Sequence, residues 1–301
     1  MRSLPLEKAS SLNNLKSYFS FMAPGRTANY LGLYRTDATL ISFVTFLVGS
    51  GIANTIALND VIAAAFVTFV SVNFIYSFNS WADSHIDKIS KPFRPIPSGR
   101  IMRSHAFIYS MGLLSISLIY PFLLFQSSLP ILLCLFLPVL GLLYSAKPIR
   151  MRDRPYASII VICLGLVIPM LIGYFSNHGT LPESFVFLVI ELYCLSVIPL
   201  KKIEEIDEDR LEGIVNLYAL WGRTLFVYSS FMLFITLVLI YLIPLTAGET
   251  LFSTTLIVST ILIIWTSHIF DIDRKRIYSF IINVAIAESI IFVLYMKFIT
   301  S

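Results

Sequence analysis

The stretch VIAAAFVTFVSVNFIYSFNS (residues 61–80) runs directly into WADSHIDKISKPFRPIPSGR (residues 81–100). The first part is predominantly apolar and, at about 20 residues, is long enough to cross the hydrocarbon core of a bilayer as a helix. The second part is charged and contains three prolines, which interrupt helices. The junction therefore predicts a transmembrane helix that ends in a polar cluster at the membrane surface.

The rest of the chain repeats this alternation of apolar run and polar loop. Of its 301 residues, 57% are hydrophobic and 13% are charged, with a mean hydropathy of +0.81, whereas a soluble domain carries about 25% charged residues. The apolar runs lie at residues 37–58, 61–80, 104–126, 129–146, 156–176, 184–201, 224–246, 251–269 and 278–299. We therefore expect an all-α membrane protein of about nine transmembrane helices, with an N-terminal arm at residues 1–36 and a single membrane domain at residues 37–301.

The basic residues are concentrated on one side of this predicted bundle. With nine spans, the N-terminal arm and the loops after the second, fourth, sixth and eighth runs share one side, and they hold 21 of the 22 Lys and Arg residues. Such an excess is typical of the cytoplasmic side. We therefore expect these segments to be cytoplasmic, in the inner or plasma membrane if the cell is prokaryotic.

The same distribution limits the classes of partner. A basic face suits the headgroups of anionic membrane lipids or an anionic substrate. It carries no nucleic-acid motif, and we expect neither a nucleic-acid partner nor an obligate protein partner. Cys134, Cys163 and Cys194 lie within apolar runs without CxxC spacing, which indicates buried thiols and not a disulfide framework or a metal site.

An amide and two carboxylates follow the second run at a regular spacing. Asn79, Asp83 and Asp87 are spaced i, i+4 and i+8, so a helix that continued through them would place all three on one face. Oxygen ligands of this kind are those that Mg²⁺ prefers; the alternative is an ordinary polar helix end. The basic loop that follows favours the interpretation as a Mg²⁺ site, because its cations would contact the oxygens of a phosphate group bound to the same ion. These cations are Lys91, Arg94 and Arg100.

A second acidic string, KKIEEIDEDRLEG (residues 201–213), follows the sixth run. If the helix continues to the stop signal at Gly213, Lys202, Glu205 and Asp209 share one stripe. The other acids lie opposite this stripe (Glu204 and Asp207) or at its margin (Glu208 and Glu212).

The fourth run ends in a third polar string, YSAKPIRMR (residues 144–152). It adds a phenol and three cations to the same membrane face, namely Tyr144, Lys147, Arg150 and Arg152.

Together the three strings resemble the signatures of the UbiA-type intramembrane prenyltransferase superfamily. Asn79-x3-Asp83-x3-Asp87 followed by RPIPSG (residues 94–99) resembles its first motif, residues 144–152 its central element, and Glu205-x3-Asp209 its second acidic motif. The resemblance covers nearly the whole chain. It implies a ring of nine helices around a central cavity, and transfer of a prenyl group from a prenyl diphosphate to a lipophilic acceptor with Mg²⁺.

The resemblance also implies roles for single residues. Asn79, Asp83 and Asp87 would hold Mg²⁺ on one side of the diphosphate, and Glu205 and Asp209 on the other. Asp83, Asp87 and Asp209 are thereby expected to be catalytic. Contacts to the substrate are expected from Arg94, Tyr144, Lys147, Arg150 and Lys202.

Two positions depart from the family pattern. Glu205 stands where Asp is usual, and Lys202 stands where close members often carry an Asp. The number of Mg²⁺ ions is therefore left open. On the stripe shared with Glu205 and Asp209, the ammonium of Lys202 would face the diphosphate directly.

Two further functions are compatible with parts of the sequence. A terpene cyclase on the same scaffold would use the same metal and diphosphate residues. A transporter would use the acids inside two spans, Glu191 and Glu288, since ionisable residues at such depth are functional candidates. No inverted repeat accompanies them, which disfavours the transporter. The acceptor and the length of the prenyl chain stay open.

Overall fold

The computed structural model describes residues 29–30, 32–53, 56–177, 185–269 and 276–299. Most of the expected arm at residues 1–36 lies outside this part of the chain, as do Arg274 and Lys275 in the loop after the eighth run. The described residues are almost entirely helical, and no strand occurs among them. The predicted all-α fold is confirmed.

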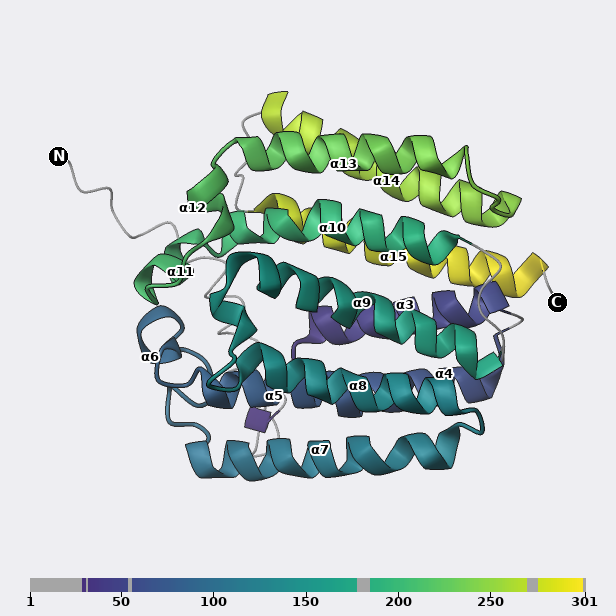
Figure 1. Ribbon diagram of the computed structural model, residues 1–301. Coiled ribbons are helices and arrows are strands. Elements are labelled where there is room, and N and C mark those ends of the chain that lie inside the picture. Colours follow the sequence, from purple (N-terminus) through teal and green to yellow (C-terminus); the bar gives the residue numbers. More distant parts are fainter. Residues whose placement is uncertain (1–28, 31, 54–55, 178–184, 270–275, 300–301) are drawn as a thin grey trace.

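Each of the nine predicted runs corresponds to one long helical segment in the described residues. These segments are α3 (Thr36–Ala53), α4–η2–α5 (Leu58–Phe66, Val67–Val72 and Asn73–Ala82), α7 (Arg103–Leu124), α8 (Ser128–Ser145), α9 (Pro155–Asn177), α10 (Val186–Glu204), α13 (Thr224–Ile240), α14 (Ala247–Ile269) and α15 (Ile277–Ile299). They lie side by side along one direction (Figure 1). Six are long and apolar enough to cross a membrane, and α3 and α13 contain shorter apolar helices. Many large apolar side chains on α7 and α13 are exposed, as expected where lipid takes the place of water.

Helices α3 and α9 cross at very close range, because glycine occupies both sides of the contact. A Cβ atom on Gly49 would lie 1.9 Å from the carbonyl oxygen of Met170, and one on Gly173 would lie 2.0 Å from that of Phe46. The hydroxyl of Ser50 donates to the carbonyl of Gly173 at 3.2 Å. Small residues allow such an approach between membrane helices, where apolar side chains gain nothing by leaving lipid.

Helix α10 lies within the bundle and packs against α9, α13, α14 and α15. Most of its side chains are buried. Its carboxyl end leads into the short helices α11 (Ile206–Leu211) and α12 (Leu217–Trp221). These helices lie at the same end of the bundle as α6 (Asp87–Ser90), which packs against α11 (Figure 1).

The expected continuous helices through the two acidic strings are wrong. Helix α5 ends at Ala82 and a turn leads to α6, while a second break at Glu205 separates α10 from α11. Asp83 adopts φ −89° and ψ 0° as its carboxylate turns toward arginines of another loop. Backbone i→i+4 bonds survive at both breaks, among them Asp87 N to Asp83 O and Asp209 N to Glu205 O. The spacing that the sequence predicted is therefore preserved without the helix.

Candidate active site

The first acidic cluster is built around Asp83, which is fully buried. Its Oδ1 accepts from Arg150 Nη2 at 2.8 Å, and its Oδ2 accepts from Asn79 Nδ2 at 2.8 Å and from Arg152. Asn79 also donates to Ser145 Oγ of α8 at 3.1 Å. The loop after α8 thus supplies the cations that neutralise a carboxylate at the end of α5.

Asp87, the next acid of this cluster, has one oxygen without a partner. Its Oδ2 accepts from Arg94 Nη1 at 2.7 Å, and its side chain is 1% exposed. Its Oδ1 is buried and has no hydrogen-bond partner among the described residues. A buried carboxylate oxygen without a donor is costly, so this atom marks a position that suits a cation.

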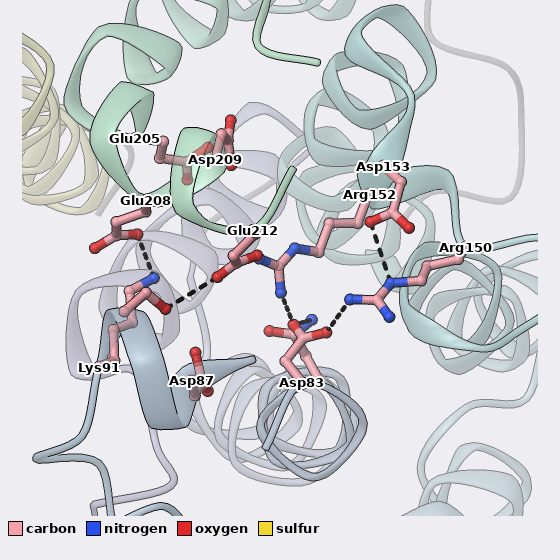
Figure 2. Close-up of polar contacts among 12 residues, drawn as sticks. Asp83, Asp87, Lys91, Arg150, Arg152, Asp153, Glu205, Glu208, Asp209 and Glu212 are labelled. Carbon is pink, nitrogen blue, oxygen red and sulfur yellow. Dashed lines mark hydrogen bonds and ion pairs between the residues drawn. The ribbon is translucent and has the colours of Figure 1, made fainter. Parts of the chain in front are cut away.

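Arg152, in the loop after α8, connects the first acidic cluster to the loop after α10. It lies between Asp83 and Glu212 and forms an ion pair with each (Figure 2). Ser90 of α6 also donates to Glu212, at 3.0 Å, and Lys91 pairs with Glu208 (Figure 2). The loops after the second, fourth and sixth runs therefore meet at one end of the bundle.

The second acidic cluster has its cations on the same stretch of chain. Lys202 Nζ lies 2.8 Å from Glu205 Oε2 and 3.6 Å from Asp209 Oδ2. Lys201 Nζ lies 2.9 Å from Glu205 Oε1. Burial of Glu205 favours its neutral form, but Lys201 and Lys202 outweigh that effect and hold its pKa well below the usual range. Lys202, Glu205 and Asp209 therefore lie together as predicted, although the helix expected to align them breaks at Glu205.

Asn216, which none of the sequence patterns above singled out, fixes this cluster. Its Nδ2 donates to Asp209 Oδ2 at 2.7 Å and to the carbonyl of Lys202 at 2.9 Å. Its Oδ1 accepts from Tyr218 N and Ala219 N as the N-cap of α12. An Asn directly before a short helical stretch is a readable capping signal.

Other predicted residues lie at the edge of this region. Glu204, expected opposite the stripe, accepts from both the backbone N and the hydroxyl of Ser279 in α15. Tyr144 is half-buried near the end of α8, and Lys147 is exposed in the loop beyond it. Arg100 donates to Phe93 O and Ser98 Oγ of its own loop.

Comparison with known proteins places this arrangement in a family. Residues 40–284 match the UbiA prenyltransferase family over most of the chain. The chain belongs to this family. The resemblance expected from the three polar strings is thereby confirmed.

Two curated relatives of the chain share one name. Digeranylgeranylglyceryl phosphate synthase of Methanothrix thermoacetophila is 32% identical over 174 residues, which cover 56% of this chain and 62% of that protein, less than two thirds of its length. The synthase of the same name from Methanosphaera stadtmanae is 29% identical over 196 residues, covering 64% of this chain and 69% of that protein. In fold, the chain is similar to a UbiA homolog from Archaeoglobus fulgidus bound to GPP and Mg²⁺, with a TM-score of 0.72, 18% identity, and coverage of 88% of this chain and 99% of that one.

An apolar cavity lies deeper in the bundle on the side of the second cluster. Its lining comes from α3, α9, α10, α14 and α15 and includes Thr45, Met170, Ile198, Leu256 and Ile282. Ile198 precedes Lys202 by one helical turn, about 6 Å. A ligand with an anionic head and an apolar tail could therefore place its head near Lys202 and its tail in the cavity.

The end of the bundle at which the two acidic clusters lie is called the polar end here. Its oxygen atoms suit a hard cation such as Mg²⁺. Carboxylate and amide oxygens are its preferred protein ligands, and Asp87 Oδ1 is an available one. No group of three or more acids, His or Cys in the described residues is already arranged around a common point, because Lys and Arg side chains pair with the carboxylates. A divalent cation and a polyanion that bind together would exchange these pairs, the cation taking the carboxylates and the anion taking the basic groups.

Proposed function

We propose that the chain transfers a prenyl group from a prenyl diphosphate to a lipophilic acceptor in the membrane. The observation that carries this proposal is a set of paired acidic and basic side chains at one end of the bundle, with one carboxylate oxygen of Asp87 unpaired among the described residues. An apolar cavity begins about one helical turn from Lys202 of the second cluster. Membership of the UbiA prenyltransferase family supports it.

The proposed roles follow from the chemistry of the leaving group. Breaking an allylic carbon–oxygen bond leaves a diphosphate with about three negative charges, which cations must neutralise. Mg²⁺, when bound, supplies this as a Lewis acid; Asn79, Asp83 and Asp87 are the residues proposed to hold it. Arg94 and Arg150, released from Asp87 and Asp83, would bind the diphosphate oxygens. Tyr144 and Lys147 stay predictions as further contacts.

The apolar residues serve the other half of the reaction. An allylic carbocation reacts with water unless water is excluded. The cavity between α3, α10 and α15 is lined almost entirely by apolar side chains, and we propose that it receives the prenyl chain. Glu205 and Asp209 remain the predicted acids of the opposite side.

For the acceptor, the names of the relatives support one class. A digeranylgeranylglyceryl phosphate carries two geranylgeranyl groups, so a synthase for it would add the second to a glyceryl phosphate that bears the first. We propose this acceptor class, with geranylgeranyl diphosphate as donor. The transporter alternative has no support from the family.

The test is an assay in isolated membranes with radiolabelled geranylgeranyl diphosphate, Mg²⁺ and geranylgeranylglyceryl phosphate, followed by identification of the labelled lipid. We expect a doubly prenylated glyceryl phosphate only when the acceptor is present. A labelled cyclic hydrocarbon formed without acceptor would instead establish the cyclase alternative. Absence of any labelled product would refute both enzyme functions.

We also propose that the polar end of the bundle faces the cytoplasm, as the distribution of basic residues favours. Gly213→Cys provides an accessible thiol at this end for a membrane-impermeant reagent, since the three native cysteines are buried. Labelling only from the extracytoplasmic side of sealed vesicles would overturn the orientation.

A further inference from the structure

Lys202 occupies a position in the second cluster where a cation has two carboxylates as neighbours. Its side chain is 4% exposed, and its Nζ lies within 4 Å of both Glu205 Oε2 and Asp209 Oδ2. These are the two acids that a metal ion on this side would need. The ammonium therefore stands where it neutralises both.

The position of this ammonium is fixed from several directions. The carbonyl of Lys202 accepts from Asn216 Nδ2, and the same amide group donates to Asp209. Lys201 Nζ lies 2.9 Å from the remaining oxygen of Glu205. With two lysines against two acids, the second cluster is electrically balanced from within one short stretch of chain.

The first cluster differs in one decisive atom. Asp87 Oδ1 is the buried carboxylate oxygen without a hydrogen-bond partner in the described parts of the two clusters. Its neighbour Arg94 is 24% exposed, so this guanidinium can turn toward a ligand at little desolvation cost. Lys202, in contrast, has almost no contact with solvent to turn to.

We propose that Lys202 is a built-in counter-cation that takes the place of a metal ion at Glu205 and Asp209, so that the chain binds the diphosphate with a single Mg²⁺, at Asp83 and Asp87. This inference depends on the proposed function, because it concerns the diphosphate site of that reaction. An ammonium has three N–H donors. Glu205 takes one of them, and Asp209 lies in ion-pair range at 3.6 Å. A further N–H donor is therefore available to a diphosphate oxygen.

The experiment counts metal ions and does not require turnover. Purified, metal-free protein in detergent is titrated with Mn²⁺ in the presence of geranyl thiolodiphosphate, an unreactive analogue, and bound Mn²⁺ is counted by electron paramagnetic resonance. We expect one Mn²⁺ per wild-type chain. Lys202→Asp, which restores a carboxylate in place of the cation, is expected to bind two.

Two further variants separate the charge of Lys202 from its surroundings. Lys202→Met, similar in length and neutral, is expected to bind the analogue about tenfold more weakly, the size of one charge-assisted contact. Lys201→Met is the matched control, because Lys201 pairs with the same Glu205 but forms no ion pair with Asp209 in the described part of the chain. For this variant we expect one Mn²⁺ and a change in analogue affinity of less than about threefold.

Two Mn²⁺ ions in the wild type would overturn the inference. It would also be overturned if Lys202→Asp bound one Mn²⁺ and had the same analogue affinity as the wild type. If Lys202→Asp does not fold, equal analogue affinity of Lys202→Met and wild type overturns it instead. A wild type that binds two ions and still forms the prenylated product would refute only the role of Lys202. A wild type that neither binds the analogue nor forms product would refute the proposed function itself.

Discussion

The two acidic clusters are similar in composition but differ in how the chain builds them. In the first, Asp83 meets Arg150 and Arg152 from a loop more than 60 residues away. In the second, Lys202, Glu205 and Asp209 lie within one short stretch. The first cluster joins three loops, whereas the second is completed locally by Asn216.

This difference separates a responsive site from a fixed one. Ion pairs between distant loops change when the loops move or when a ligand competes for either partner. Pairs within one short stretch of chain keep their geometry as long as the adjoining ends of α10 and α11 persist. We therefore expect substrate binding to rearrange the first cluster and to leave the second largely as it is.

The largest expected effects come from the two aspartates of the first cluster, and they should differ in kind. Asp87→Ala and Asp83→Ala should each lower transfer activity by more than about 100-fold, beyond the loss expected for a residue that only supports a metal ligand. Asp83→Ala should in addition destabilise the protein by about 1–3 kcal/mol, because Arg150 and Arg152 lose a shared buried acceptor and keep one acid each, Asp153 and Glu212. Asp87→Ala should cost about 1 kcal/mol or less, since Arg94 can reach solvent.

Thermal unfolding can be followed with a thiol-reactive dye, because Cys134, Cys163 and Cys194 are buried in the folded protein. Asp207→Ala, exposed on α11, is the control and should retain activity and stability close to wild type. Equal stability of the two aspartate variants would contradict the contrast drawn between their partners. Near-wild-type turnover in both would remove the first cluster from the reaction.

Much of this architecture was predictable because apolar runs and basic loops are local properties of the sequence. The nine segments and the grouping of Lys202, Glu205 and Asp209 needed only lengths and helical periodicity. The turn at Asp83 was not predictable in this way, since it depends on arginines that approach from another loop. For the same reason, the bridge from Arg152 to Glu212 required the folded chain.

Removal of the Arg152 bridge is expected to lower transfer activity less than loss of Asp83 or Asp87 does. Its guanidinium pairs with Asp83 and with Glu212, whose side chain is fully buried. Arg152→Met should lower activity by about 10- to 100-fold by freeing the loop after α10 from the first cluster. Arg152→Lys should fall between this variant and the wild type, because a single ammonium does not reproduce the planar fork that spans both acids.

Arg154→Met, two residues further on and exposed, provides the matched control for loss of positive charge in this loop. Activity should be measured at several diphosphate concentrations, because a loosened loop should raise KM more than it lowers kcat. If Arg154→Met impairs the enzyme as much as Arg152→Met, the effect is one of net charge and the bridge has no special role.

The smallest expected effect tests whether the second cluster is fixed by Asn216. Asn216→Ala removes the N-cap of α12, worth about 1 kcal/mol, and the donor to Asp209. Asn216→Ser keeps an acceptor for the cap but is too short to donate to Asp209 in the same way. Both variants should lose about tenfold in activity, as expected when a supporting hydrogen bond to a site residue is removed, but only Asn216→Ala should also lose stability. Recovery of full activity in Asn216→Ser would mean that Asn216 acts through the helix cap alone, and that Lys202 suffices to hold Asp209 in place.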